Sequence, residues 1–135
     1  MPAINYWAVL VAAVAAFIEG ALWYTPLLFG KQWLALRGVS PEAGADRKIP
    51  AWKLVAQFVR DLVVAFVLAR FIALLAVAGW LGAVQVAAWM WIGFQATLLL
   101  GGVIHENMPW KLYAIHEGDA LVKILLMAVI LGVWR

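Results

Sequence analysis

Four long apolar segments dominate the pattern of hydrophobic and polar positions along the chain. They cover about residues 5–28, 52–80, 83–104 and 110–134. A helix needs ~20 residues to cross the hydrocarbon core of a bilayer, so each segment is long enough. None of them alternates polar and apolar residues as a membrane-barrel strand must, and a helix satisfies its own backbone hydrogen bonds in lipid. The pattern predicts an all-α, integral membrane four-helix bundle that forms a single domain over residues 1–135.

The connections between these segments predict the topology. The links near Leu81-Gly82 and 105–109 are short, which makes successive helices antiparallel neighbours. The connection over residues 30–51 is longer, and basic residues gather in and beside it: Lys31, Arg37, Arg47, Lys48 and Lys53. The other side of the predicted membrane has only Arg135 and the amino terminus. Because basic loops stay in the cytoplasm, we expect a cytoplasmic loop over 30–51 and both termini outside.

The composition agrees with a lipid environment and excludes several kinds of chemistry. The 135 residues are 67% hydrophobic, with a mean hydropathy of +0.97, whereas ordinary globular chains are about 45–50% apolar. There is no cysteine, which excludes disulfides and thiolate nucleophiles. With a single serine and no glycine-rich phosphate loop, no complete catalytic set is present, and we expect a protein that is not an enzyme. The basic loop indicates orientation or contact with lipid headgroups and no nucleic-acid site.

Small residues recur every four positions along three of the predicted helices. The stripes are Ala8, Ala12, Ala16 and Gly20, then Ala65, Ala69 and Ala73, then Gly93, Thr97 and Gly101. Stripes of this kind let helix backbones approach closely in lipid. They predict close packing within the bundle, and they would also suit contact between copies of the chain in a homo-oligomer.

Ionisable side chains interrupt the apolar segments. They are Glu19, Arg60, Asp61, Arg70, His116, Glu117, Asp119 and Lys123. A charged side chain costs roughly 2.5–3.5 kcal/mol at the centre of a membrane helix, so such residues are expected to face the bundle interior and to pair. In the predicted topology most of them lie in the cytoplasmic half, with Arg70 and Lys123 nearer the midplane. The sequence therefore predicts a charged intramembrane cluster.

Three interpretations of this cluster stay open. The charges could be ion pairs that hold the helices in register, or they could line a path for protons, ions or small solutes. Alternatively, His105, Glu106, His116 and Glu117 could bind a metal, or a histidine could ligate a tetrapyrrole. The dipeptide His-Glu occurs twice but never continues to the HExxH zinc motif, and nothing in the sequence requires a cofactor. A further alternative is a structural or accessory subunit of a larger membrane complex.

Two stretches resemble a known family. GALWYTPLLFGKQW (20–33) and MPWKLYAIHEGDALVKILLMAVILG (108–132) are similar to the two signatures of a bacterial membrane family, domain of unknown function 1761. The resemblance implies a four-helix protein of the bacterial inner membrane without an assigned activity, so it transfers no catalytic residue. The family pattern is largely apolar or uncharged where this chain has Glu19, Arg70, Glu117, Asp119 and Lys123. The resemblance thus implies that the charge network is a feature of this chain and not of the family as a whole.

Overall fold

A computed structural model describes residues 3–38 and 49–134, and these residues are all-helical. The long helices are α1 (Tyr6–Trp23), α4 (Ala51–Leu74) and α7 (Trp110–Val133). A further long helix is continuous but has three parts: α5 (Gly79–Met90), the π-helical η1 (Trp91–Ala96) and α6 (Thr97–His105). The predicted loop contains a short helix, α2 (Gly30–Leu36), and its basic residues Arg47 and Lys48 lie outside the described residues.

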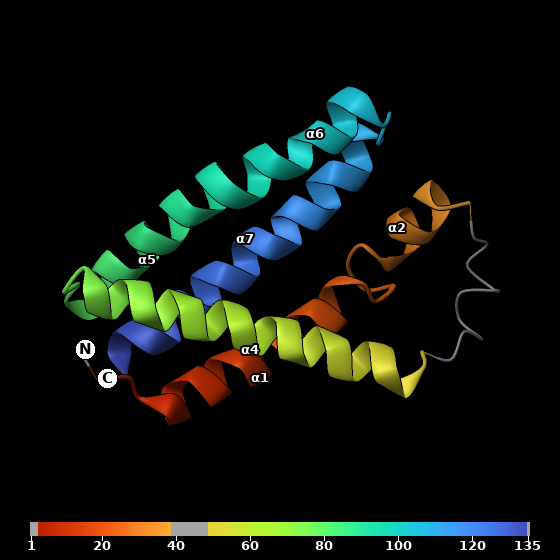
Figure 1. Cartoon of the computed structure of the whole chain (residues 1–135). Helices are drawn as coiled ribbons and strands as arrows, with labels where there is room; N and C mark the ends of the chain where they lie inside the picture. The colour runs from red at the N-terminus through yellow and green to blue at the C-terminus, as the bar shows by residue number, and fades with distance from the viewer. Residues whose placement is uncertain (1–2, 39–48, 135) are drawn as a thin grey trace.

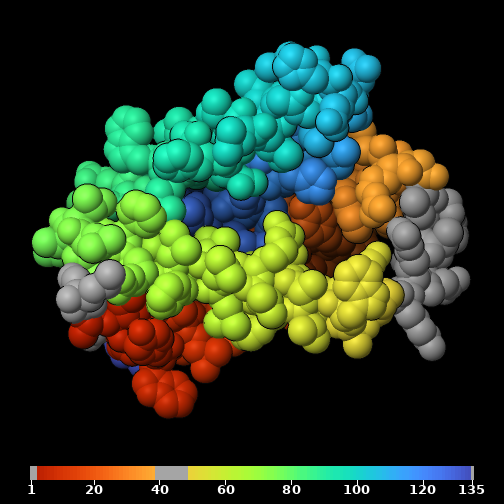
Figure 2. Space-filling view, viewed as in Figure 1, coloured from red at the N-terminus to blue at the C-terminus, as the bar shows by residue number. Residues whose placement is uncertain are grey.

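The helices run up and down, with α7 in the centre (Figure 1). Helices α1, α4 and α7 pack against one another, and α5 packs on another side of α7. The two chain ends and the α4–α5 turn lie at one end of the molecule, while α2 and the α6–α7 link lie at the other (Figure 1). We call these the terminal end and the α2 end. Helices α4 and α6 diverge towards the α2 end, and Figure 2 shows a groove between them whose floor is α7.

Two helix ends differ from the boundaries that the sequence predicts. Helix α1 ends at Trp23 and not near residue 28, because Pro26 lacks the N–H that would continue the helix. Helix α4 ends at Leu74, so the link to α5 comes earlier than the predicted Leu81-Gly82. Ala76 and Gly79 bend the chain there with positive φ angles of 53° and 77°. The apolar pattern could not locate this turn, since the residues around it are themselves apolar.

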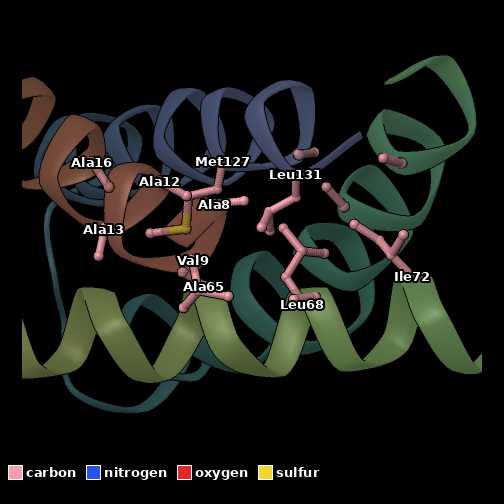
Figure 3. Packing of buried hydrophobic residues seen from close by; sticks show 14 residues of the cluster. Ala8, Val9, Ala12, Ala13, Ala16, Ala65, Leu68, Ile72, Met127 and Leu131 are labelled. Atoms are coloured by element: carbon pink, nitrogen blue, oxygen red, sulfur yellow. The ribbon is translucent and has the colours of Figure 1, made fainter. Parts of the chain in front are cut away.

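The core of the bundle is built from small side chains (Figure 3). In α1 the buried residues include Ala8, Ala12 and Ala16, and in α4 they include Ala65 and Ala69. The largest fully buried apolar side chains, Leu68 and Met127, fill the space that these alanines leave. The first two predicted stripes therefore serve close packing of α1, α4 and α7. The third predicted stripe, Gly93, Thr97 and Gly101, does not pack in this way. A Cβ built on Gly93 or Gly101 would meet nothing within 4 Å among the described residues.

The outer surface is strongly apolar. Side chains such as Trp7, Trp89 and Phe94 are more than two-thirds exposed. Two helices are long and apolar enough to cross a membrane, Tyr6–Trp23 and Gly79–His105. Helices α4 and α7 have the length as well, but they carry more charged residues. The fold thus agrees with association with a membrane.

Candidate functional site

The structure brings the charges of three helices together around one ammonium group. Lys123 of α7 extends its Nζ between two carboxylates, 3.7 Å from Asp61 Oδ1 and 3.6 Å from Asp119 Oδ2. Asp61 comes from α4 and is only 2% exposed, and Asp119 is 8% exposed. These distances describe ion pairs and are too long for direct hydrogen bonds. The base is therefore shared between two buried acids on different helices.

Helix α1 adds a third acid to this group. The buried Glu19 carboxyl lies close to Asp119, Lys123 and Asp61. The next residue, Gly20, makes room for the base, since a Cβ at that position would lie 3.0 Å from Lys123 Nζ. We call Glu19, Asp61, Asp119 and Lys123 the carboxyl cluster. It forms where the small-residue stripe of α1 meets the polar face of α7.

The carboxyl cluster has more acceptors than donors. Both oxygens of Glu19, Asp61 Oδ2 and Asp119 Oδ1 are buried and have no hydrogen-bond partner among the described residues. A carboxylate only accepts hydrogen bonds, so Glu19 and Asp119 can bond to each other only when one of them carries a proton. With every group ionised, three negative charges would face a single positive one. Such an excess of buried negative charge is costly, which makes the cluster a place where a cation or a proton is stabilised.

Polar side chains of α4 connect this cluster with the surface. Gln57 lies one helical turn before Asp61, and its Nε2 donates to Asp61 Oδ1 at 3.1 Å. Arg60 in turn donates from Nη1 to Gln57 Oε1 at 3.0 Å, and its side chain is exposed. Arg60 thus lies at the edge of the cluster and reaches Asp61 through Gln57.

On the side of the α2 end, a tyrosine and a histidine adjoin the carboxyl cluster. Tyr24 follows directly after α1, and its hydroxyl oxygen lies 2.8 Å from His116 Nδ1. Asp119 lies close to this hydroxyl, one helical turn further along α7 than His116. The ring of Tyr24 packs on Trp33 of α2 at 4.9 Å between ring centroids, and Arg37 lies over Trp33 at 4.9 Å from its centroid. Tyr24 therefore bonds to His116 and lies near Asp119.

Glu117 belongs to a different polar group, on another side of α7. It is 3% exposed, and its Oε1 accepts from Gln95 Nε2 at 3.2 Å, while its backbone carbonyl accepts from Trp91 Nε1 at 3.0 Å. Both donors belong to the π-helical segment η1. The sequence placed Glu117 with the other charges by depth alone, but its neighbours in the structure are on η1. The reason is that consecutive residues of a helix point about 100° apart, so Glu117 and His116 lie on different sides of α7.

The remaining predicted site residues lie elsewhere. Arg70 is half-buried, more than two turns further along α4 towards the terminal end. His105 and Glu106 are exposed at the end of α6. Within residues 3–38 and 49–134, no three His, Cys, Asp or Glu side chains come close enough to hold a metal ion. The candidate ligands His105, Glu106, His116 and Glu117 are therefore not brought together.

Several contributors to these groups were not singled out from the sequence as site residues. Tyr24, Trp33 and Trp91 look like ordinary interface aromatics in the sequence, and nothing in their spacing indicates their partners. Gln57 carries a detectable signal, because it precedes Asp61 by four residues on one helix face. Gln95 is likewise a polar side chain within an apolar segment.

A groove between α1 and α7 passes beside Glu19. Its volume is about 490 Å³, and only apolar atoms line it, including those of Ile18, Leu22 and Leu126. Glu19 borders this groove with its apolar stem, and its carboxyl turns towards Asp119. The carboxyl cluster is thus shielded on this side by hydrocarbon.

The two stretches that carry the family resemblance meet in the structure. Trp23 Nε1 of the first donates to the backbone carbonyl of Ile115 in the second at 3.0 Å, and Tyr24 reaches His116. A Cβ on Gly118 would lie 2.9 Å from the Trp23 ring, so the glycine admits that ring against α7. Residues far apart in the sequence thus form one contact region.

Comparison with known proteins gives one match. No curated protein and no solved structure matches the chain. A family model described as "protein of unknown function (DUF1761)" matches residues 7–132, which include the carboxyl cluster and nearly all of α1 and α7. Since this match covers most of the chain, the protein belongs to that family.

Proposed function

We propose that the protein is a four-helix, multi-pass protein of the bacterial inner membrane that conducts protons, or other small ions or solutes, through its carboxyl cluster. One observation carries the proposal. Three acids from α1, α4 and α7 gather near a single lysine inside an apolar bundle, and four of their oxygens are buried without a hydrogen-bond partner in the part of the chain that the structure describes. Intramembrane acids and histidines of this kind commonly form proton and ion pathways.

The distribution of charge supports a membrane orientation with both termini outside. Lys31 and Arg37 of α2, Lys53 at the start of α4 and Lys111 at the start of α7 all belong to the α2 end. The opposite end has the chain termini and the α4–α5 turn (Figure 1). Basic residues favour the cytoplasmic side, so in this proposal the α2 end faces the cytoplasm. The carboxyl cluster then lies in the inner half of the membrane.

The outer half of the proposed path is closed by the apolar core. Beyond Lys123, the space between α1, α4 and α7 is filled by Ala12, Ala65, Leu68 and Met127 (Figure 3). An apolar constriction of this kind gates by excluding water, and it conducts when it widens enough to become wet. Leu68 and Met127 are the bulky side chains of this constriction, so they must move before it can widen. We propose that these two side chains form the gate.

Proton flux into liposomes tests this function. The purified protein is reconstituted with a pH-sensitive dye trapped inside, and a potassium gradient with valinomycin drives protons inward. Glu19→Gln and Asp119→Asn keep the shape of each side chain and remove its charge, so both are expected to abolish flux. Glu106→Gln is the matched control, because Glu106 is exposed outside the cluster. Flux that equals the wild type in Glu19→Gln and Asp119→Asn would rule out conduction through the cluster.

A second candidate is a homo-oligomer or an accessory subunit of a larger membrane complex. The observation that favours it is the third small-residue stripe. Within the described residues, a Cβ on Gly93 or Gly101 would meet nothing within 4 Å, and Thr97 between them is exposed. Native mass spectrometry of the gently extracted protein tests this candidate. A multiple of the chain mass would support an oligomer, a foreign subunit would support the accessory role, and added mass of a metal or tetrapyrrole would identify a cofactor.

A further inference from the structure

We propose that Tyr24 and His116 form the relay through which protons enter the carboxyl cluster from the α2 end. This inference rests on the proposed function and adds two named groups with defined roles. Neither group touches Lys123 or Asp61 through a hydrogen bond among the described residues, so both lie outside the ion-paired centre. Because they lie on the α2 side of Asp119, we assign them to the step in which protons enter the carboxyl cluster.

The geometry brings Tyr24 against His116 and close to the carboxyl cluster. The Tyr24 hydroxyl oxygen is 2.8 Å from His116 Nδ1, which is an ordinary hydrogen-bond distance. Asp119 follows His116 by three residues on the same face of α7, near both Tyr24 and Glu19, and its Oδ1 is buried without a hydrogen-bond partner among the described residues. His116 is half-buried near the start of α7, where α2 packs against that helix. The path therefore runs from His116 through Tyr24 to Asp119 and Glu19.

Each group on this path can accept one proton while it releases another. When His116 is the doubly protonated imidazolium, its Nδ1–H donates to the tyrosine oxygen, which frees the tyrosine O–H to turn to the nearby Asp119 carboxylate. A transfer then moves the Nδ1 proton to the tyrosine oxygen as the hydroxyl proton passes to the Asp119 carboxylate. Tyr24 ends the step neutral, His116 has lost one proton and Asp119 has gained one. Reprotonation of the imidazole from the α2 end resets the relay.

The surrounding charges suit this direction of transfer. Arg37 of α2 lies near His116, and Arg60 of α4 lies near Tyr24, so two permanent cations border the relay. Asp119 and Glu19 lie on its other side. A proton leaving His116 thus moves away from Arg37 and towards the acids. The contact of the Tyr24 ring with Trp33, whose other neighbour is Arg37, holds the tyrosine ring in the position that the transfer requires.

Tyr113 of α7 offers a matched comparison with Tyr24. The Tyr113 hydroxyl donates to the backbone carbonyl of Ala96 at 2.6 Å. A backbone carbonyl does not take up a proton in a transfer chain at ordinary pH, so Tyr113 can only hold η1 against α7. Loss of a hydroxyl at position 113 removes one hydrogen bond, as it does at position 24, but it should leave proton flux unchanged.

The experiment measures proton flux in liposomes for Tyr24→Phe, His116→Asn, Tyr113→Phe and Asp119→Asn. The phenylalanine keeps the ring on Trp33, and asparagine places an amide nitrogen near the position of Nδ1 without titrating. We expect flux to fall about a hundredfold in Tyr24→Phe and His116→Asn, a size typical of losing one proton-transfer group. Tyr113→Phe should match the wild type. Flux in D₂O is measured in parallel, since removal of the transfer step should change the H₂O-to-D₂O flux ratio, whereas a purely structural loss should not.

The outcomes separate this inference from the proposed function. If Asp119→Asn abolishes flux while Tyr24→Phe and His116→Asn keep it, the cluster conducts but the relay is wrong. If Asp119→Asn itself keeps wild-type flux, conduction through the cluster is wrong. Circular dichroism and the thermal midpoint identify a variant that fails to fold. His116→Asn, which can retain a hydrogen bond to Tyr24, then decides the case if Tyr24→Phe is unstable.

Discussion

The two halves of the α1–α4–α7 packing, one towards the α2 end and one towards the terminal end, have the same architecture and opposite chemistry. Both halves use small residues of α1 to bring the helices together, Ala8 and Ala12 in one and Ala16 and Gly20 in the other. Towards the terminal end the space is filled by hydrocarbon, mainly Leu68 and Met127, whereas towards the α2 end it holds Lys123 and three acids. The comparison shows that close helix packing alone does not decide what fills a bundle.

The two halves should also respond differently to substitution. An apolar side chain can be shortened at the cost of a cavity, which is graded by volume. A buried charge that loses its partner leaves the other charge uncompensated, which is a larger and more abrupt penalty. Three substitutions test this contrast, and each is measured as the change in free energy of unfolding in mixed detergent micelles.

Replacement of Lys123 should have the largest effect. Lys123→Met keeps the length of the stem but leaves Asp61 and Asp119 buried without their base, which costs about 3–5 kcal/mol for pairs of this kind. Lys111→Met on the same helix is the control, since Lys111 is exposed and should change stability little. An unfolding curve for Lys123→Met that overlays the wild type would show that the ammonium does not stabilise the acids.

Shortening of Leu68 should come next. Leu68→Ala creates a cavity in the apolar half and should cost about 2–5 kcal/mol. In liposomes it should also raise proton flux, because it widens the proposed gate. Leu74→Ala is the control on the same helix, since Leu74 is 58% exposed and faces outward. A destabilised Leu68→Ala whose flux per folded molecule does not rise would place the gate elsewhere.

Substitution of Gly20 should have the smallest effect, at the junction of the two halves. Its Cβ would lie 3.0 Å from Lys123 Nζ, so the ammonium at the end of its flexible side chain must give way by a few tenths of an ångström. We expect Gly20→Ala to cost about 1 kcal/mol, at the low end of the cost of overpacking. The control is Gly101→Ala in α6, where the new methyl group meets nothing within 4 Å. Equal stability of Gly20→Ala and the wild type would mean that Lys123 has other room to occupy.

The helical organisation was accessible from the sequence because it depends on local pattern. Long apolar segments, small residues at every fourth position and the breaker at Pro26 are each visible along one stretch of chain. The prediction of an all-helical fold is confirmed, and so is the close packing of the first two stripes. The α4–α5 turn was misplaced because its residues are as apolar as the helices that it joins. The π-helical segment has no sequence signal that spacing alone reveals.

The sequence by itself determined which residues are charged and roughly how deep each lies along its helix. Only the tertiary structure decided which of them meet. Glu19, Asp61, Asp119 and Lys123 converge because α1 and α4 cover neighbouring sides of α7, and Glu117, two residues before Asp119, faces η1 instead. Rotation of a helix about its axis is set by packing against its neighbours, and that packing joins segments about a hundred residues apart, as in the contact of Tyr24 with His116.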